Sequence, residues 1–282
     1  MMSMKIQIEN LTKKYKGKEV LKDINCVLEP EKYGIIGPNG SGKTTFIRCL
    51  IQIIQYHGNI LFDGKKANKH LQIGYLPQAF HGFREFTVYE QLEYFMVFKN
   101  IKTNKDEEIE RVLQIVRLEN EKNKKIRSLS GGMVRRLGIA QALLGHPDLL
   151  IFDEPTVGLD PDERLHFREI IGSLKLDIPI ILTTHIIEDV SSICDNLIFL
   201  KQGEVKYIGN IQHLLESFKN HVYECPVKQL SHIQESYIRS EIHQDKVRII
   251  SHKELDYPFL TALSPSMEDI YQTINQDYEK LS

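Results

Sequence analysis

The strongest chemical signal in the sequence is a glycine-rich segment that ends in a lysine and two threonines. It fits the pattern G-x-x-x-x-G-K-[ST] in full and consists of Gly37, Pro38, Asn39, Gly40, Ser41, Gly42, Lys43 and Thr44, with Thr45 directly after it. Glycines allow consecutive backbone N–H groups to turn toward one anion without Cβ clashes. Lys43 can then reach the β- and γ-phosphates of a nucleotide, while the Thr44 hydroxyl holds Mg²⁺. The segment predicts a site for ATP with Mg²⁺.

Two carboxylates stand at the end of an apolar run. Asp153 and Glu154 follow Leu149-Leu150-Ile151-Phe152, a run that is typical of a buried strand. A buried strand is an unfavourable place for charge unless a cation or a reaction requires it. We expect Asp153 to coordinate the Mg²⁺, directly or through water, and Glu154 to polarise the water that attacks the γ-phosphate.

A second candidate anion site lies between these two segments. It reads Leu129-Ser130-Gly131-Gly132-Met133 and opens a predicted helix that carries Arg135 and Arg136. A serine hydroxyl and glycine N–H groups at a helix N-terminus attract an anion. This LSGG stretch resembles the signature of the ATP-binding cassette (ABC) family, which few other phosphate-loop families carry. The resemblance extends over roughly residues 4–215.

The resemblance implies roles for four more residues. Tyr15 is similar to the aromatic residue that stacks on adenine, although a lone tyrosine in a basic turn is more often ordinary surface. Gln78 is similar to the hinge glutamine that senses Mg²⁺, and Asp160 to the aspartate that communicates between two ATP sites. His185 is similar to the histidine that contacts the γ-phosphate, although a lone histidine after a strand is usually structural. The expected catalytic residues are then Glu154, His185 and Gln78, and the expected Mg²⁺ ligands are Thr44, Gln78 and Asp153.

The signature also implies a partner. In the ABC family it contacts the γ-phosphate of an ATP molecule that another copy holds, so the resemblance implies a nucleotide-sandwich dimer with a second copy of the chain or a sister ATPase subunit.

Two positions depart from the family pattern. Met133 stands where the family most often has Gln, and Glu31-Lys32 replaces the usual Gly-Glu before a strand. We expect Met133 to leave catalysis intact, because Ser130 and the glycine amides supply the phosphate contacts.

The order of the predicted elements indicates the fold class. Short strands are expected within residues 4–35, and the apolar strands Leu149–Phe152, Ile178–Thr183 and Asn196–Leu200 alternate with helical patterns, as in a parallel sheet. We predict an α/β protein with a phosphate-loop (RecA-like) core, an antiparallel β subdomain, an inserted helical subdomain and a small C-terminal accessory segment. The ATPase domain is expected at 1–215, with the helical subdomain at about 80–147, and the accessory segment at 216–282.

One helix of the inserted subdomain can be placed from its apolar period. Ile109, Val112, Leu113 and Val116 recur at i, i+3, i+4 and i+7, which predicts an amphipathic helix over 106–118. Thr103 with Asp106 offers a capping box at its start.

Charge and hydropathy limit the partners. The 282 residues carry a formal net charge of −2 with a pI near 6.6, so we expect no nucleic acid partner. Apolar runs such as Leu149–Phe152 are far shorter than the roughly 18 residues that span a bilayer. A transporter role therefore requires a separate integral membrane permease, which would hold the chain as a peripheral subunit at the cytoplasmic face of the cell membrane. The permease is expected near Gln78–Glu90, where four aromatic residues either line a groove or belong to the core: Phe80, Phe83, Phe86 and Tyr89.

Three segments resemble the bacterial drug- and peptide-export branch of the family. They are Ser130–Met133, Glu154–Pro161 and the late run Pro265–Tyr271. We therefore expect an ATP-hydrolysing subunit that drives export of a drug, an antimicrobial peptide or a lipid-like substrate. One alternative is an ABC ATPase that acts on ribosomes or DNA, although the former usually join two motor domains and the latter insert long coiled coils. Another is an importer motor, which would normally carry Gln at position 133.

Overall fold

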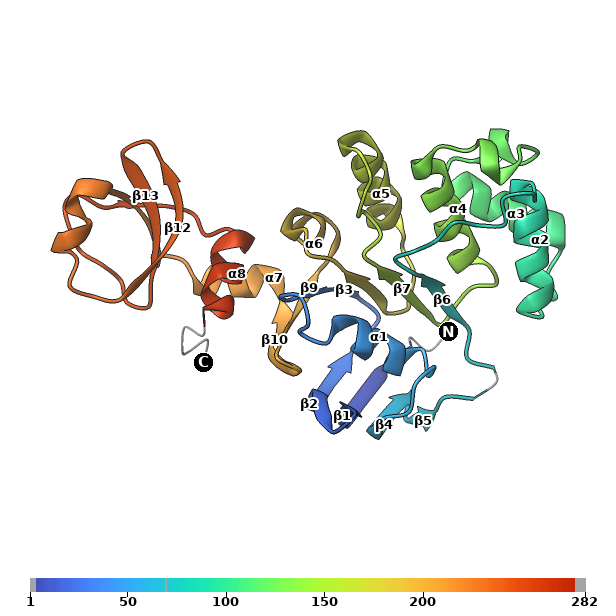
Figure 1. Ribbon diagram of the computed structural model, residues 1–282, viewed down its shortest axis with the longest axis horizontal. Helices are drawn as coiled ribbons and strands as arrows, with labels where there is room; N and C mark the ends of the chain where they lie inside the picture. Colours follow the sequence, from blue (N-terminus) through green and yellow to red (C-terminus); the bar gives the residue numbers. More distant parts are fainter. Residues whose placement is uncertain (1–3, 69, 277–282) are drawn as a thin grey trace.

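The computed structural model describes residues 4–68 and 70–276, and these residues form three β-sheets along an elongated molecule (Figure 1). Helices α2 (Val88–Phe98), α3 (Lys105–Ile115) and α4 (Gly131–Leu143) lie at one end, and the C-terminal sheet lies at the other. The outer limits of the expected ranges, residues 1 and 282, lie outside the described residues.

The central sheet has the strand order β10-β9-β3-β8-β7-β6. Strands β3, β6, β7, β8 and β9 pair in parallel, and β10 pairs antiparallel with β9. The bounds are β3 Lys32–Ile36, β6 Ile73–Leu76, β7 Leu149–Asp153, β8 Ile180–Thr183, β9 Asn196–Lys201 and β10 Glu204–Asn210. Strands β7 and β8 are buried along their whole length, as expected for a parallel sheet that is covered on both faces. The α/β class expected from the sequence is confirmed.

Alternate side chains of the central strands enter two separate cores. Leu149 and Ile151 of β7 join a cluster with helix α1 (Lys43–Leu50). Leu150 and Phe152 of the same strand join a second cluster with helices α4 and α5 (Pro161–Ser173). Helix α6 (Ile187–Ile193) packs on the latter face, where Val190 lies against Gly34 of β3. The phosphate-loop helix and the signature helix are therefore held on opposite faces of one sheet.

An antiparallel sheet covers the outer side of α1. Its order is β2-β1-β4-β5, and its bounds are β1 Ile6–Tyr15, β2 Lys18–Leu28, β4 His57–Phe62 and β5 Lys65–Lys66. Ile6 of β1 pairs with Leu28 of β2 on one side and with Phe62 of β4 on the other. All three side chains are buried in the cluster that contains α1. This sheet is the antiparallel part that the sequence predicts.

The helical end is built from capped helices. Thr87 and Glu90 form a capping box at the start of α2. Helix α3 begins after Asn104, whose side chain accepts hydrogen bonds from the backbone N–H groups of Asp106 and Glu107. The capping box expected from Thr103 and Asp106 is therefore wrong, and the helix expected over 106–118 ends at Ile115. Two 3₁₀ turns, Glu119–Glu121 and Ile126–Ser128, lead to α4.

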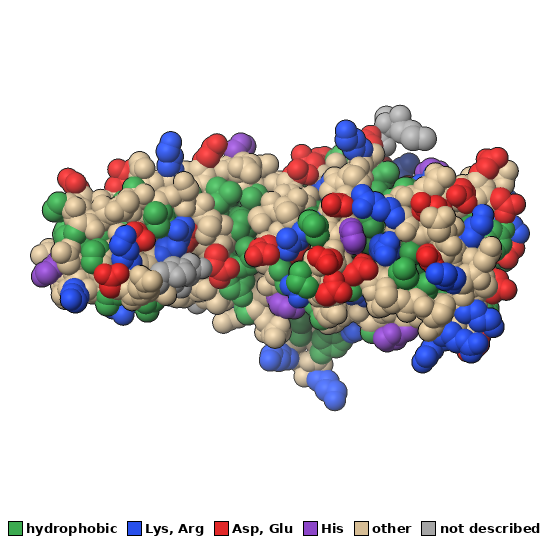
Figure 2. Space-filling model, turned by 90° about the horizontal axis from the view of Figure 1, so that it is seen from above, with side chains coloured by type: hydrophobic (Ala, Val, Ile, Leu, Met, Phe, Trp, Pro, Cys, Tyr) green, Lys and Arg blue, Asp and Glu red, His purple; other side chains and the backbone are tan. Residues whose placement is uncertain are grey.

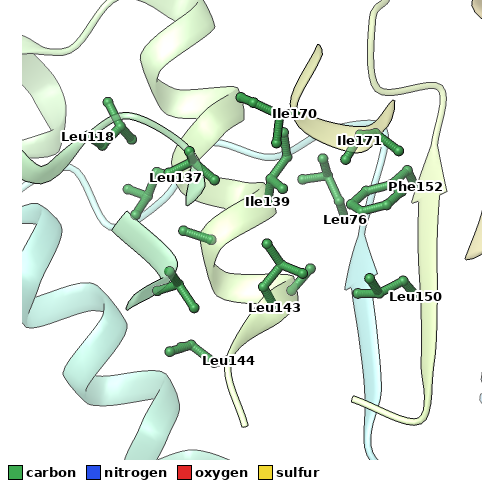
Figure 3. Packing of buried hydrophobic residues seen from close by; sticks show 14 of the residues in the cluster. Leu76, Leu118, Leu137, Ile139, Leu143, Leu144, Leu150, Phe152, Ile170 and Ile171 are labelled. Atoms are coloured by element: carbon green, nitrogen blue, oxygen red, sulfur yellow. The ribbon is translucent and has the colours of Figure 1, made fainter. Parts of the chain in front are cut away.

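Helix α4 packs directly against the central sheet (Figure 3). The shared cluster contains apolar side chains of α4, α5 and strands β6 and β7, among them Leu76, Leu137, Ile139, Leu143, Leu150, Phe152, Ile170 and Ile171. The signature helix is therefore fixed to the two strands whose ends lead to Gln78 and Glu154.

The residues after β10 form a further sheet. Helix α7 (Ile211–Ser217) leads to strands in the order β12-β13-β11-β14, with bounds β11 Val222–Pro226, β12 Tyr237–His243, β13 Lys246–Ser251 and β14 Thr261–Ala262. A 3₁₀ turn, Val227–His232, follows β11. Helix α8 (Met267–Asn275) then returns to the central sheet, where Ile270 lies in one apolar cluster with Phe199 of β9.

Two surface properties bear on the expected partners. Among the described residues no helix is both long and apolar enough to cross a membrane. Figure 2 shows acidic and basic side chains intermixed over the visible face, without a continuous basic stripe across it.

Candidate nucleotide-binding site

The predicted site residues meet at one edge of the central sheet. The glycine-rich loop follows β3, Gln78 follows β6, Glu154 follows β7 and His185 follows β8. Because these four strands are parallel, their carboxyl ends lie at the same edge, where open α/β sheets bind ligands.

The glycines of the phosphate loop allow it to pack closely against neighbouring backbone. Gly37 has φ 152°, and a Cβ there would lie 1.9 Å from the Leu200 carbonyl oxygen. Gly42 has φ 110°, and a Cβ there would lie 2.9 Å from the Val20 carbonyl oxygen. Any larger residue would push the loop off β9 and β2, so these positions require glycine.

The loop presents donors suited to an anion. The buried Lys43 ammonium donates to the carbonyl oxygens of Gly37 at 2.7 Å and Pro38 at 3.4 Å. Burial lowers the pKa of Lys43, and the charges of Glu154 and Asp153 oppose that shift. The hydroxyl of Ser41 is buried without a hydrogen-bond partner among the described residues. Helix α1 begins directly after this loop and has no side-chain cap at Gly42, so no capping side chain occupies the N–H groups of its first turn. The residues present fit a bound triphosphate.

Thr183 of β8 orients the predicted Mg²⁺ ligand Asp153. Its hydroxyl donates to Asp153 Oδ1 at 2.6 Å, and the Tyr75 hydroxyl donates to Asp153 Oδ2 at 3.3 Å. Burial and the adjacent Asp153 raise the pKa of Tyr75 to about 12, so the phenol keeps its proton and remains a donor. Asp153 itself is 3% exposed.

Glu154, the predicted general base, is held by backbone and side-chain contacts. Its N–H donates to the Thr183 carbonyl at 3.0 Å and the Thr183 hydroxyl at 3.1 Å. Its backbone adopts the left-handed region, with φ 46°, a conformation that costs about 1–3 kcal/mol and often marks functional sites. Its Oε2 lies 2.8 Å from Nδ1 of the exposed His185 ring. Two residues that the sequence assigned to catalysis are therefore in direct contact.

The donor set suits a magnesium ion that arrives with phosphate. Among the described residues no group of three or more His, Cys, Asp or Glu side chains could hold a metal ion alone. Mg²⁺ keeps several waters and binds through one or two carboxylates plus substrate phosphates. Asp153 at the strand end and the exposed Thr44 on the first turn of α1 match that requirement, with Gln78 exposed on the loop after β6.

The other predicted residues lie apart from this edge or act locally. Ser130 caps α4, since its hydroxyl accepts from the Met133 N–H at 3.1 Å, and Asp160 likewise caps α5. The carboxylate of Glu163 lies against Gly132. Tyr15 ends β1 and is 41% exposed, and Lys13 Nζ lies 4.8 Å from its ring centroid. Among the described residues, no hydrogen bond joins Ser130 or Tyr15 to the phosphate loop of the same chain.

Comparison with known proteins identifies the family. A family model described as ABC transporter matches residues 21–157. The chain is 31% identical over 271 residues to the linearmycin resistance ATP-binding protein LnrL of Bacillus subtilis, covering 86% of this chain and 87% of the relative. It is 33% identical over 221 residues to the Nod factor export ATP-binding protein I of Cupriavidus metallidurans, covering 75% of this chain and 73% of that relative. The chain belongs to the ABC transporter ATP-binding proteins.

Solved ABC ATPase structures share this fold. The dimeric structure of a bacterial ABC transporter cassette superimposes with a TM-score of 0.65 at 28% identity, covering 73% of this chain and 98% of the cassette. That cassette is also known as a dimer after hydrolysis, bound to ADP and Pi. The family resemblance drawn from the LSGG stretch is confirmed, and so are ATP hydrolysis and ATP with Mg²⁺ as the cofactors.

Some residues of the ABC ATPase site escaped the sequence reasoning. Thr183 and Tyr75 stand close to the predicted residues His185 and Gln78 in the sequence, but their roles depend on side-chain contacts to Asp153 across strands, which local spacing does not show. Of the four aromatic residues expected near the permease, Phe80 and Tyr89 pack on the core, while Phe83 and Phe86 are exposed and lie against Tyr94 of α2, which in turn contacts Phe98. The i, i+4 spacing of Tyr94 and Phe98 on α2 was the sequence signal that could have located these two residues.

Proposed function

We propose that this ABC ATPase drives export of a drug, an antimicrobial peptide or a lipid-like substrate through a separate membrane permease, at the cytoplasmic face of the cell membrane. Two relatives support export, because one is named for linearmycin resistance and the other for Nod factor export. The late run Pro265–Tyr271, which resembles the export branch, contains the capped start of α8 and adds to that support.

The contact between Glu154 and His185 best supports the catalytic roles. Glu154 accepts a proton from the water that attacks the γ-phosphate, and His185, fixed by Glu154, contacts that phosphate. Lys43 and the loop amides from Gly37 to Thr45 bind the phosphates, and Tyr15 stacks on the adenine. Thr44, Gln78 and Asp153 would hold the Mg²⁺, which would neutralise charge on the phosphate oxygens.

The working unit is a dimer that encloses two ATP molecules. Ser130, Gly131 and Gly132 lie at the N-terminal end of α4, where Ser130 and Gly131 are exposed, and no hydrogen bond among the described residues joins them to the phosphate loop of their own chain. They bind the γ-phosphate of ATP held by a second copy or a sister subunit, and Asp160 faces the same interface. The dimeric cassette of similar fold supports this arrangement.

The permease docks on an aromatic surface formed by Phe83, Phe86, Tyr94 and Phe98. Phe98 is 74% exposed and the neighbouring Val97 76%, although both are apolar. The rings contact one another at centroid distances of 5.2 Å (Phe83–Phe86) and 5.3 Å (Phe83–Tyr94). Continuous exposed apolar area of this kind marks an interaction site.

We assign the ATPase domain to 1–215 and the accessory part to 216–282, with the helical subdomain at about 80–147.

Replacement of Glu154 tests the catalytic assignment. Glu154→Gln should bind ATP as tightly as the wild type, lower the rate of phosphate release by about 10²–10⁴-fold, and accumulate an ATP-bound dimer in gel filtration. Lys43→Ala is the contrasting variant, because it should lose ATP affinity instead. Undiminished phosphate release by Glu154→Gln would show that another group is the base.

Co-purification tests the transporter assignment. When the chain is tagged at its chromosomal locus and purified from detergent extracts, a multispan membrane protein should co-purify with it. Phe98→Ser should weaken that association. Co-sedimentation with ribosomes, without a membrane protein, would exclude the transporter role and favour the ribosome-acting alternative.

A further inference from the structure

A buried arginine on the signature helix bonds to the backbone of two catalytic loops. Arg135 Nη1 donates to the carbonyl oxygens of Pro77 at 3.1 Å and Gln78 at 2.8 Å. Its Nη2 donates to the Glu154 carbonyl at 2.6 Å, and its Nε to the Pro155 carbonyl at 2.6 Å. One guanidinium therefore joins the loop after β6 to the loop after β7.

The chemistry of this contact favours arginine over a packing residue. Arg135 is 7% exposed, and a buried charge is costly unless it is well hydrogen-bonded. Burial lowers the pKa of Arg135, while the charge of Asp153 opposes that shift. A guanidinium has a rigid planar array of donors that can serve several fixed carbonyls at once, whereas an ammonium is a compact point charge.

The two loops are those that require fixing. Glu154 has the left-handed φ of 46°, which persists only where surrounding contacts hold it. The side chain of Gln78 is exposed on an irregular loop. The hydrogen bond from Arg135 therefore fixes this residue through its backbone carbonyl. Arg135 holds both from α4, which is itself packed on β6 and β7 through the cluster in Figure 3.

We propose that Arg135 is a positioning residue for ATP hydrolysis, which fixes the backbone of Glu154 and Gln78 relative to each other. This inference rests on the proposed roles of Glu154 and Gln78. Among the described residues Arg135 makes no hydrogen bond to the phosphate loop or its lysine, so we expect it to act on the rate of the chemical step and not on nucleotide affinity.

Two substitutions at this position separate positioning from stability. Arg135→Gln and Arg135→Lys should lower kcat by about 10²-fold, since small displacements of catalytic groups have effects of that size. The Kd of a fluorescent ATP analogue, measured at equilibrium, should stay within about threefold of the wild-type value. Arg135→Lys keeps the charge and serves if Arg135→Gln fails to fold.

Arg111→Gln is the matched control. Arg111 also donates to a backbone carbonyl of α4, that of Leu143 at 3.0 Å, and pairs with the buried Glu108 at 2.6 Å. Neither of these two partners belongs to the loop after β6 or the loop after β7. Arg111→Gln should lower the melting temperature, because it leaves the buried Glu108 carboxylate without its arginine, while kcat stays near wild type. A parallel loss of kcat in Arg111→Gln would mean that destabilisation alone explains the effect.

A double-mutant cycle provides the decisive measurement. If Arg135 acts through Glu154, then Arg135→Gln should cause little further loss of single-turnover rate in a Glu154→Gln background, because residues that act as a unit are non-additive. A full additional loss, or Arg135 variants with wild-type kcat, would overturn the inference. Wild-type protein without ATP turnover would instead overturn the proposed roles themselves, so the two failures are distinguishable.

Discussion

At the residue scale, Thr183 connects both carboxylates of the acidic strand end. Its side chain is fully buried, and its hydroxyl donates to Asp153 while accepting from the Glu154 N–H. A valine of nearly the same shape would keep the packing and lose both hydrogen bonds. The adjacent Thr184 is equally buried, but within the described part of the chain its hydroxyl accepts only from the Ile186 N–H, at 2.9 Å.

Thr183→Val should therefore affect stability and catalysis, and Thr184→Val chiefly stability. An unsatisfied buried carboxylate oxygen costs about 1–3 kcal/mol. Loss of a partner that orients a metal ligand typically lowers activity by about 10–100-fold. Steady-state ATP hydrolysis and chemical denaturation of both variants check this, and equal ATPase rates in the two would contradict it.

The site residues could be predicted because contiguous motifs carry them. The loop at Gly37–Thr44 and the strand end at Asp153 are defined by local spacing, and the structure places both at one sheet edge. Arg135 lay in the predicted helix, but its partners are backbone carbonyls 57 and 19 residues away, which no side-chain pattern encodes. The assigned roles of all these residues stay predictions, those of Lys43, Thr44, Asp153 and Glu154 as well as those of Tyr15, Gln78, Ser130, Asp160 and His185.

At the element scale, the contact between β6 and α4 depends on one missing side chain. A Cβ on Gly74 of β6 would lie 2.3 Å from the Ala142 carbonyl oxygen of α4. That oxygen belongs to backbone, so the helix itself would have to move. Gly172 of α5 offers a contrast, because a Cβ there would meet no atom within 4 Å.

The same glycine-to-alanine change should therefore lower the free energy of unfolding at one of these positions and raise it at the other. Gly74→Ala should lower the free energy of unfolding by about 1–3 kcal/mol through overpacking. Gly172→Ala should raise it by up to about 1 kcal/mol, because alanine is the better helix former. Urea titrations followed by circular dichroism measure both, and a destabilised Gly172→Ala with an unchanged Gly74→Ala would refute the packing argument.

Element boundaries were less predictable than element types. The amphipathic period of Ile109, Val112 and Leu113 correctly predicted a helix, but its first turn is capped by Asn104 and not by Thr103. An asparagine amide reaches the same N–H groups as a threonine hydroxyl from the next position, so the choice depends on how the preceding chain enters the helix.

At the scale of the whole molecule, one apolar cluster joins the ATPase core to the C-terminal sheet. It contains Ile36 at the end of β3, Phe199 of β9, Ile250 of β13 and Ile270 of α8. The Phe199 and Tyr271 rings add a contact with 5.6 Å between centroids. Helix α8 therefore lies between two sheets, and the part that the sequence suggested was a small accessory segment shares its core with the phosphate-loop strand.

Ile270→Ala should destabilise both sheets together. Ile270 is fully buried, so its truncation should cost about 2–5 kcal/mol. Ile242→Ala is the control, because Ile242 is 65% exposed on β12 and should change little. Denaturation followed by both near-UV and far-UV signals should show one shifted transition. Two separated transitions, with the core unshifted, would mean that the sheets unfold independently.

Helix α8 is also connected to the phosphate loop, through two hydrogen bonds made by β9 and the turn that follows it. Lys201 of β9 donates to the Asn275 carbonyl at 2.7 Å, and Gly203, two positions later, donates to the Ser41 carbonyl at 2.9 Å. For the construction of chimaeras this has a direct meaning. A C-terminal part taken from a relative will not fit as an independent module, and a graft has to bring β9 and its following turn with it.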